Sequence, residues 1–165
     1  MRRRGDQRYT RWEDQEVSLR LAERVRHRAD GGPLWYPFPD AHGFNGQWWL
    51  GYAFGGHRYF SVWDGDNEVA QVDLDEQVCA DEYPGAPTGR DLLEVQFLEV
   101  REGCRLEGLG TEIVSMIANA NPGRRLVAFP SEEAEGFWGD HLRWDRYDDP
   151  ENRLRAPLLV SPTIG

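Results

Sequence analysis

Residues 92–118 constrain the fold more than any other stretch of the chain. Residues 92–100 (LLEVQFLEV) are rich in Leu, Val and Phe and are bounded by turn formers, which predicts a mostly buried strand. Further on, nonpolar residues at 110, 113, 114 and 117 have the spacing of one helix face. A short glycine-bearing loop joins the two. The unpaired N–H groups at the start of such a helix form an anion site, most naturally for phosphate.

Three kinds of phosphate loop compete for this segment. A nucleotide P-loop needs Lys and then Ser or Thr after its second glycine, but Leu109 follows Gly108 here and the chain contains no Lys. A dinucleotide fingerprint needs a third glycine where Ile113 stands. The pattern that fits is Arg105-x-x-Gly108-x-Gly110, directly after a strand and directly before a helix.

This pattern resembles motif A of the GNAT superfamily of acyl-CoA N-acyltransferases, whose backbone amides hold the pyrophosphate of coenzyme A. By that resemblance the pyrophosphate loop comprises Arg105, Leu106, Glu107, Gly108, Leu109, Gly110 and Thr111. Two further matches lie at the expected distances. Residues 131–138 (SEEAEGFW) are similar to the family's Asn-x-x-Ala-x-x-Phe-Tyr pattern, which assigns Ser131 and Phe137 to the CoA site. Residues 59–74 are similar to the hairpin formed by its second and third strands.

The resemblance covers residues 58–147 and implies a mixed α/β (α+β) fold. The expected architecture is a mostly antiparallel sheet of six to seven strands whose central parallel pair splays, with helices on both faces. The strand at 126–129 would be the parallel partner of 93–100. We expect a flexible Arg-rich N-terminus over residues 1–9 and a single acyltransferase domain over residues 10–165.

Composition narrows the choice of partners. A net charge of −10 disfavours nucleic acid and attracts cationic substrates, although solubility alone explains it as well. The chain has no apolar run long enough to span a membrane. Its two cysteines fit a reducing cytoplasm better than a disulfide framework. The four histidines show no metal-binding spacing with these cysteines, so we expect no metal.

The region before the hairpin is rich in aromatic residues. Thr10-x-x-Glu13 resembles a capping box, and an apolar stripe at 12, 17, 21 and 25 predicts a helix that residues 30–33 end. Residues 33–63 then hold 11 of the chain's 20 aromatic side chains. These aromatics could form core, one wall of a pocket for an amine, or a homodimer interface.

Acyl transfer from a thioester to an amine needs a positioned thioester, a polarised carbonyl and a neutral amine. By resemblance, backbone groups of Leu98 and Val100 would position the thioester. Glu94 is the best candidate for the base, since a glutamate in an apolar strand should have a raised pKa. Glu99 and Asp73 are the reserves, and a β-bulge would decide which of the glutamates share a face.

The general acid is where the chain departs from the family pattern. Trp138 or Gly139, according to the alignment, stands where many members carry a Tyr that protonates the leaving thiolate. Tyr147, which we take as the candidate, or His141 would have to serve instead, or the thiolate leaves unassisted.

We therefore expect an N-acyltransferase that transfers an acetyl group from acetyl-CoA to the primary amine of a cationic small molecule. The main alternative is a non-catalytic acyl-CoA-binding regulatory module with a degenerate site. A weaker one is an aromatic-rich ligand-binding protein with an incidental motif.

Overall fold

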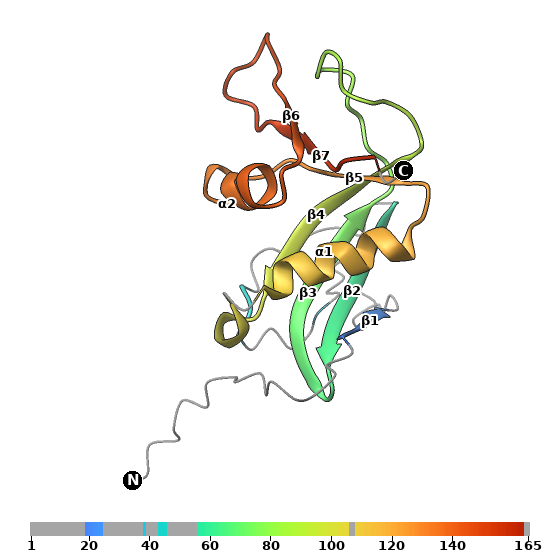
Figure 1. The fold of residues 1–165 in the computed structure, drawn as a ribbon, viewed down its shortest axis with the longest axis vertical. Coiled ribbons are helices and arrows are strands. Elements are labelled where there is room, and N and C mark those ends of the chain that lie inside the picture. The colour runs from blue at the N-terminus through green and yellow to red at the C-terminus, as the bar shows by residue number, and fades with distance from the viewer. Residues whose placement is uncertain (1–18, 25–37, 39–42, 46–55, 106–107, 164–165) are drawn as a thin grey trace, which may run out of the picture.

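The computed structural model describes residues 19–24, 38, 43–45, 56–105 and 108–163. Within these ranges one seven-stranded sheet runs through the molecule in the order β1-β2-β3-β4-β5-β7-β6 (Figure 1). The strands are β1 (Leu19–Glu23), β2 (His57–Asp64), β3 (Asn67–Asp75), β4 (Leu92–Val100), β5 (Arg125–Ala128), β6 (Asp145–Tyr147) and β7 (Leu158–Val160). The helical elements are the turn η2 (Glu102–Cys104), α1 (Leu109–Ala120), α2 (Glu132–Gly136) and the π-helical turn η3 (Phe137–His141). All strand pairs are antiparallel except β4–β5, which confirms the predicted mixed, mostly antiparallel sheet.

β2 and β3 form the hairpin predicted around residues 64–67. Asp64 pairs with Asn67 across the turn, and Gly65 has a φ of +57°, which glycine adopts without steric cost. The pairing register shifts between Val62 and Trp63, which marks a β-bulge. Because successive side chains of a strand point to opposite faces, this shift decides which β2 side chains lie beside which β3 side chains.

α1 packs against one face of the sheet, which we call the helix face (Figure 1). On this face the central strands bury a continuous apolar set: Phe60, Val62, Ala70, Val72, Leu74, Leu93 and Val95. The helix meets them with a single stripe of side chains: Leu109, Ile113, Val114 and Ile117. Each such side chain contributes about 1.5–3 kcal/mol when fully buried. The strand–loop–helix unit predicted from residues 92–118 is therefore the centre of the core.

The opposite face changes character along the sheet. Toward its β6 edge lies a second apolar cluster, which Ala80 and Tyr83 of the 76–91 loop join: Leu92, Val127, Leu158 and Val160. Phe137 and Trp138 of η3 belong to the helix-face core, so α1 and η3 pack on the same face. Across β2, β3 and β4 the opposite face also buries polar side chains, among them Ser61, Gln71, Asp73 and Glu94.

The prediction of a helix through residues 10–29 is wrong for the central part of this range. Leu19–Glu23 forms β1, which pairs antiparallel with β2. Leu19 and Leu21 pack against the core while Arg20 between them is exposed, so the local period is two residues and not 3.6. The flanking parts of the expected helix, the expected flexible residues 1–9 and most of the aromatic stretch lie outside the described residues.

Candidate active site

β4 and β5 separate partway along β4. Their parallel pairing runs from Leu92–Arg125 to Glu94–Val127 and ends there, whereas β4 continues beside β3 as far as Val100. Beyond Glu94, one edge of β4 therefore has no strand partner in the described ranges. Such an open edge can hold an extended ligand through main-chain hydrogen bonds. The predicted splay of β4 and β5 is confirmed, and Glu94 is the last residue of β4 that pairs with β5.

A second β-bulge aligns the acidic residues of β3 and β4. Asp73 lies opposite Phe97 and Asp75 opposite Glu94, so an interval of two residues on β3 matches three residues on β4. A regular strand would send Glu94 and Glu99 to opposite faces. With the bulge, both point to the face that lies away from α1.

Four titratable side chains meet on this face, and we call them the carboxylate cluster: His57, Asp73, Asp75 and Glu94. His57 Nδ1 lies 2.9 and 3.0 Å from the two carboxylate oxygens of Asp73, and its Nε2 lies 3.5 Å from Asp75. Asp75 has His57 as its register partner on β2 and Glu94 on β4. The side chain of Glu94 is buried, at 8% exposure for the residue, and has no hydrogen-bond partner among the described residues.

Burial alters the protonation of two of these carboxyls. Loss of water, followed by the charges of Asp75 and Asp73, raises the pKa of Glu94 to about 7, while His57 acts to lower it. Burial likewise raises the pKa of Asp73 to about 6, against the hydrogen bond from His57. A buried carboxyl that titrates near neutral pH can accept a proton and release it again during turnover.

Asp73 and Glu99, the two other candidates for the base, make polar contacts that Glu94 lacks within the described residues. Asp73 is hydrogen-bonded to His57. Glu99 Oε1 accepts the backbone N–H of Asn45 at 2.8 Å and lies 3.4 Å from a terminal guanidinium nitrogen of Arg105. Glu94 is the acidic side chain of this face that is both buried and unbonded within the described ranges.

Gly108 is the N-cap residue of α1 and has a left-handed backbone conformation, with a φ of +78°. Its carbonyl accepts the N–H groups of Thr111 and Glu112, and a Cβ placed on it would meet no atom within 4 Å. Among the described residues, no atom fills the space beside the Gly108 backbone, at the positive end of the helix dipole. An anion would be favoured there by the dipole and opposed by the acidic Glu112 of the first turn, and the pyrophosphate loop stays a prediction.

The other residues predicted for the CoA loop take different positions. Arg105 turns back to β4, where its Nε donates to the Val100 carbonyl at 3.0 Å. Leu98 and Val100 pack their side chains against the helix-face core, and Leu109 is buried in it, so each offers a ligand only backbone groups. Leu106 and Glu107 lie outside the described residues.

Gly110 and Thr111 connect α1 to η3. A Cβ on Gly110 would lie 3.1 and 3.2 Å from two ring carbons of Phe137, so only glycine lets the helix approach this ring so closely. Thr111 Oγ1 is 3.0 Å from His141 Nε2, and His141 stacks on Phe137 with ring centroids 5.9 Å apart. Phe137 and His141 thus lie beside the first turn of α1.

The remaining predicted residues are not brought to Glu94. Tyr147 lies on β6 and packs with the second apolar cluster, and both β5 and β7 lie between its strand and β4. Trp138 is 6% exposed and packs on Trp144, with ring centroids 4.7 Å apart. Ser131 precedes α2, but its hydroxyl donates to Glu133 instead of capping the helix.

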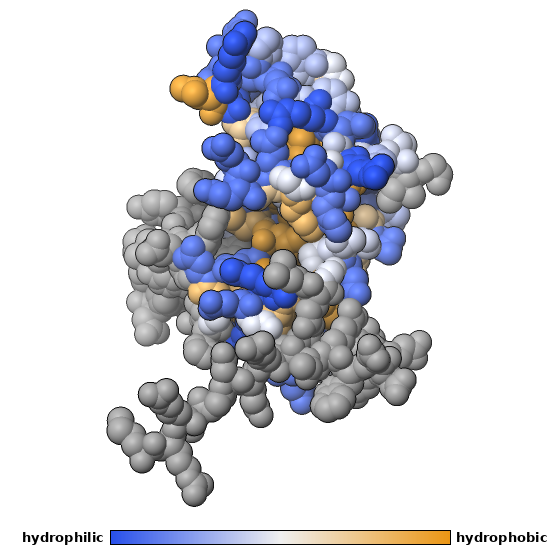
Figure 2. Space-filling model, turned by 60° about the vertical axis from the view of Figure 1, so that its left-hand side comes forward, coloured by the Kyte–Doolittle hydropathy of each residue, from blue (hydrophilic) through white to orange (hydrophobic). Residues whose placement is uncertain are grey.

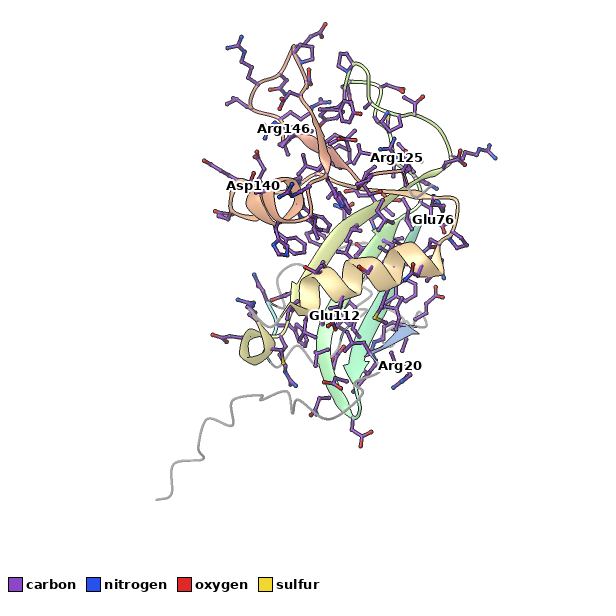
Figure 3. All side chains as sticks on the ribbon, in the orientation of Figure 1. Arg20, Glu76, Glu112, Arg125, Asp140 and Arg146 are labelled. Carbon is purple, nitrogen blue, oxygen red and sulfur yellow. The ribbon has the colours of Figure 1, made fainter. Side chains whose placement is uncertain are left out.

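The space-filling and side-chain views show a hollow in the surface and the two ends of the sheet. Figure 2 shows a hollow with an apolar floor on the side that carries α2 and the end of β4. Glu112 lies on α1, whereas Glu76 and Arg125 mark the end of the sheet where β4 begins (Figure 3). At that far end lies a cavity of about 580 Å³, lined by Gly56, Arg90 and Arg124 among others, which contains none of the predicted CoA residues.

Sequence reasoning missed the roles of His57, Asp75 and Tyr83. The spacing of His57 suggested no metal site, and no pattern in the sequence brings Asp75 to Glu94. The charge of Glu94 also acts on the phenol of Tyr83, whose pKa burial raises. Alternation along the strands shows that His57, Asp75 and Glu94 share a face only when both bulges are known, and Tyr83 lies on a loop, where alternation gives no signal.

Comparison with known proteins bears on the fold. No protein-family model matches the chain, and no curated protein matches it in sequence. An acetyltransferase from Thermus thermophilus has a similar structure, with a TM-score of 0.50 and 20% sequence identity over 67% of this chain and 67% of that one. The Bacillus subtilis N-acetyltransferase YlbP, in complex with coenzyme A, gives a TM-score of 0.48 and 24% identity over 63% of this chain and 67% of its own. The likeness to the Thermus thermophilus protein shows the fold of this chain, which is the fold of that acetyltransferase.

Two searches of the described residues, one for groups of metal-ligating side chains and one for membrane-spanning helices, found none. No group of three or more His, Cys, Asp or Glu side chains there is arranged to hold a metal ion. No helix in the described part of the chain is both long and apolar enough to cross a membrane.

Proposed function

We propose that the protein is an N-acyltransferase that transfers an acetyl group from acetyl-CoA to the primary amine of a cationic small molecule. One observation carries the proposal: Glu94 is buried and unbonded within the described residues, has a pKa of about 7, and lies where β4 and β5 separate. The open backbone at Gly108 and the GNAT-type fold support the same function.

Each step of the proposed reaction is assigned to particular residues of the chain. The open edge of β4 beyond Glu94 would align the acyl donor, and the backbone at Gly108 and Gly110 would bind its pyrophosphate. Glu94 accepts a proton from the bound ammonium, which leaves the amine lone pair free. Acetyl-CoA supplies a thioester, in which the C–S bond breaks as the amine nitrogen forms a C–N bond, and the sulfur leaves with the electron pair and takes up a proton.

The charges near Glu94 favour a cationic acceptor. The carboxylate cluster combines three carboxyls with one imidazole, in a chain whose net charge is −10. An ammonium group therefore gains from the local field, whereas a carboxylate beside Glu94 would be repelled.

The second candidate function is a non-catalytic acyl-CoA-binding module. The observation in its favour is Trp138, which is buried against Trp144 at the position where a proton donor is expected. Tyr147 is separated from β4 by two strands and does not replace that donor. Binding without turnover would select this candidate over the enzyme.

The first experiment is thermal unfolding with CoA and with acetyl-CoA. A ligand at 100 times its Kd stabilises the folded state by about 2.7 kcal/mol, which raises Tm measurably. Gly108→Glu should abolish the shift, because the side chain fills the open loop and repels phosphate. Gly123→Glu is the matched control: Gly123 has a φ of +83° and equally open surroundings, but it lies beyond the other end of α1. Full shifts in both variants would overturn the assignment of the loop.

Turnover is then measured as thiol release from acetyl-CoA in the presence of cationic amines. Release that depends on both the amine and Glu94 would establish the transferase. A clear CoA shift with no release for any acceptor would favour the binding module.

A further inference from the structure

His57 is inserted between two carboxylates of the same sheet face. Its Nδ1 lies within 3.0 Å of both oxygens of Asp73, and its Nε2 lies 3.5 Å from Asp75. Asp75 is in turn the register partner of Glu94. The imidazole is mostly buried, with 15% of its side-chain surface exposed, and stacks on Tyr59 with ring centroids 6.1 Å apart. Its position is therefore fixed on several sides.

We propose that His57 is a positioning residue that supplies the counter-charge for the carboxylate cluster and thereby sets the pH at which Asp73 and Glu94 ionise. The geometry favours such a charge, because three carboxyls crowd one mostly buried face and no described residue donates a hydrogen bond to Glu94. Two adjacent carboxylates without a cation cannot both stay ionised in such a place.

The groups that face Glu94 can be named strand by strand. β2 contributes His57, β3 contributes Asp73 and Asp75, and the 76–91 loop contributes Tyr83. Glu99 lies further along β4 and is already paired with Arg105. His57 is thus the single described side chain in this set that can carry a positive charge.

The consequence for catalysis rests on the proposed function. If Glu94 takes the acceptor's proton, it must be ionised when the ammonium arrives. His57 favours that state by lowering the pKa of Glu94, whereas Asp73 and Asp75 oppose it. His57 touches neither substrate nor reacting atoms in this scheme and acts only through the carboxyls.

The test uses the free chain and needs no ligand. The side-chain carboxyl carbons of Asp73 and Glu94 are followed by NMR against pH in the wild type, in His57→Gln and in Asp75→Asn. Removing the cation should move the apparent titrations of the pair to higher pH, and removing a neighbouring anion should move them lower, each by about half a pH unit or more. His141→Gln, a change on the helix-face side, is the control and should move neither.

Shifts of opposite sign would support the proposal, and unchanged titrations in His57→Gln would overturn it. If His57→Gln does not fold, the same carboxyl titrations in His57→Asn and Asp75→Asn decide the matter, because loss of the ring must still move them to higher pH and loss of the anion to lower pH.

A kinetic measurement separates this proposal from the function on which it rests. With acetyl transfer established, His57→Gln should move the acid limb of the kcat/KM profile to higher pH and leave the rate on the plateau nearly unchanged. A lower plateau with an unmoved limb would mean a merely structural role. Absence of any transfer would remove the proposed function, and the carboxyl titrations would still decide the role of His57.

Discussion

The two faces of β2, β3 and β4 bury side chains of opposite polarity. The helix face is lined by aliphatic and aromatic side chains that α1 covers. The other face buries Gln71, Asp73 and Glu94 at 0%, 3% and 8% exposure. Aliphatic burial stabilises the fold by about 25 cal/mol per Å², whereas a buried carboxyl costs free energy unless it is paired or protonated. The helix face therefore accounts for stability, and the carboxylate cluster is a cost that a function would explain.

Among changes to the two faces, the largest expected effect is the loss of turnover when Glu94 is replaced. Glu94→Gln should reduce kcat/KM by about 10²–10⁴-fold, the usual contribution of a positioned base, with CoA affinity unchanged. The measurement is thiol release at a pH about one unit above the pKa of Glu94, where the wild-type carboxyl is ionised. Glu99→Gln on the same face of β4 is the control, and a greater loss there would transfer the role of base to Glu99.

On the helix face a truncation should act on stability alone. Ile113→Ala removes a side chain that is 0% exposed and should lower the free energy of unfolding by about 2–5 kcal/mol. Urea denaturation of the variant checks this. Ser115→Ala, on the exposed side of the same helix, should stay within about 0.5 kcal/mol of the wild type. Equal losses in both would contradict the assigned core.

The cost of the buried carboxyl should appear as a dependence of stability on pH. The pKa of Glu94 is raised from 4.5 to about 7, so between these pH values the folded state binds more protons than the unfolded state. The wild type therefore loses stability relative to Glu94→Gln as the pH rises through this window. The variant should match the wild type below pH 4.5 and be more stable by up to about 3 kcal/mol above pH 7. A constant difference across the window would mean that Glu94 is not buried as described.

The smallest effect is expected at the position of the missing proton donor. Trp138→Phe keeps an aromatic ring against Trp144 and should change kcat by less than about twofold, since the indole transfers no proton. Steady-state kinetics at saturating acetyl-CoA measures it. A large fall in kcat with an unchanged Tm would show that Trp138 has a direct part in the reaction.

Local patterns in the sequence predicted the central unit well. The nine-residue strand, the helix that follows Gly108 and the hairpin at 64–67 each carry their own signal in apolar spacing or turn residues, and the structure contains all three. The glycine turn between β4 and α1 could be located because Gly108 and Gly110 stand between two strongly apolar segments, whereas its binding of phosphate stays a prediction. The high pKa of Glu94 also followed from its place in an apolar strand.

The arrangement of the carboxylate cluster could not be read from the sequence, because two β-bulges define it. Without the bulge at Val62, the hairpin register would place His57 opposite Leu74, on the wrong face for Asp73. Without the bulge in β4, Glu94 and Glu99 would face opposite ways. A bulge changes the backbone without any required residue type, so alternation alone cannot locate it. β1 was missed for a related reason, since the open edge of β2 selects strand over helix only in the folded molecule.

The close approach of Gly110 to Phe137 links the start of α1 to two tryptophans whose fluorescence can be measured. Phe137 touches the edge of Trp138 at a centroid distance of 5.0 Å, and Trp138 lies 4.7 Å from Trp144. A ligand bound at the first turn of α1 would lie near Phe137, whose ring contacts Trp138, and Trp138 in turn packs on Trp144. Tryptophan fluorescence should therefore report occupation of the loop directly, with no added label.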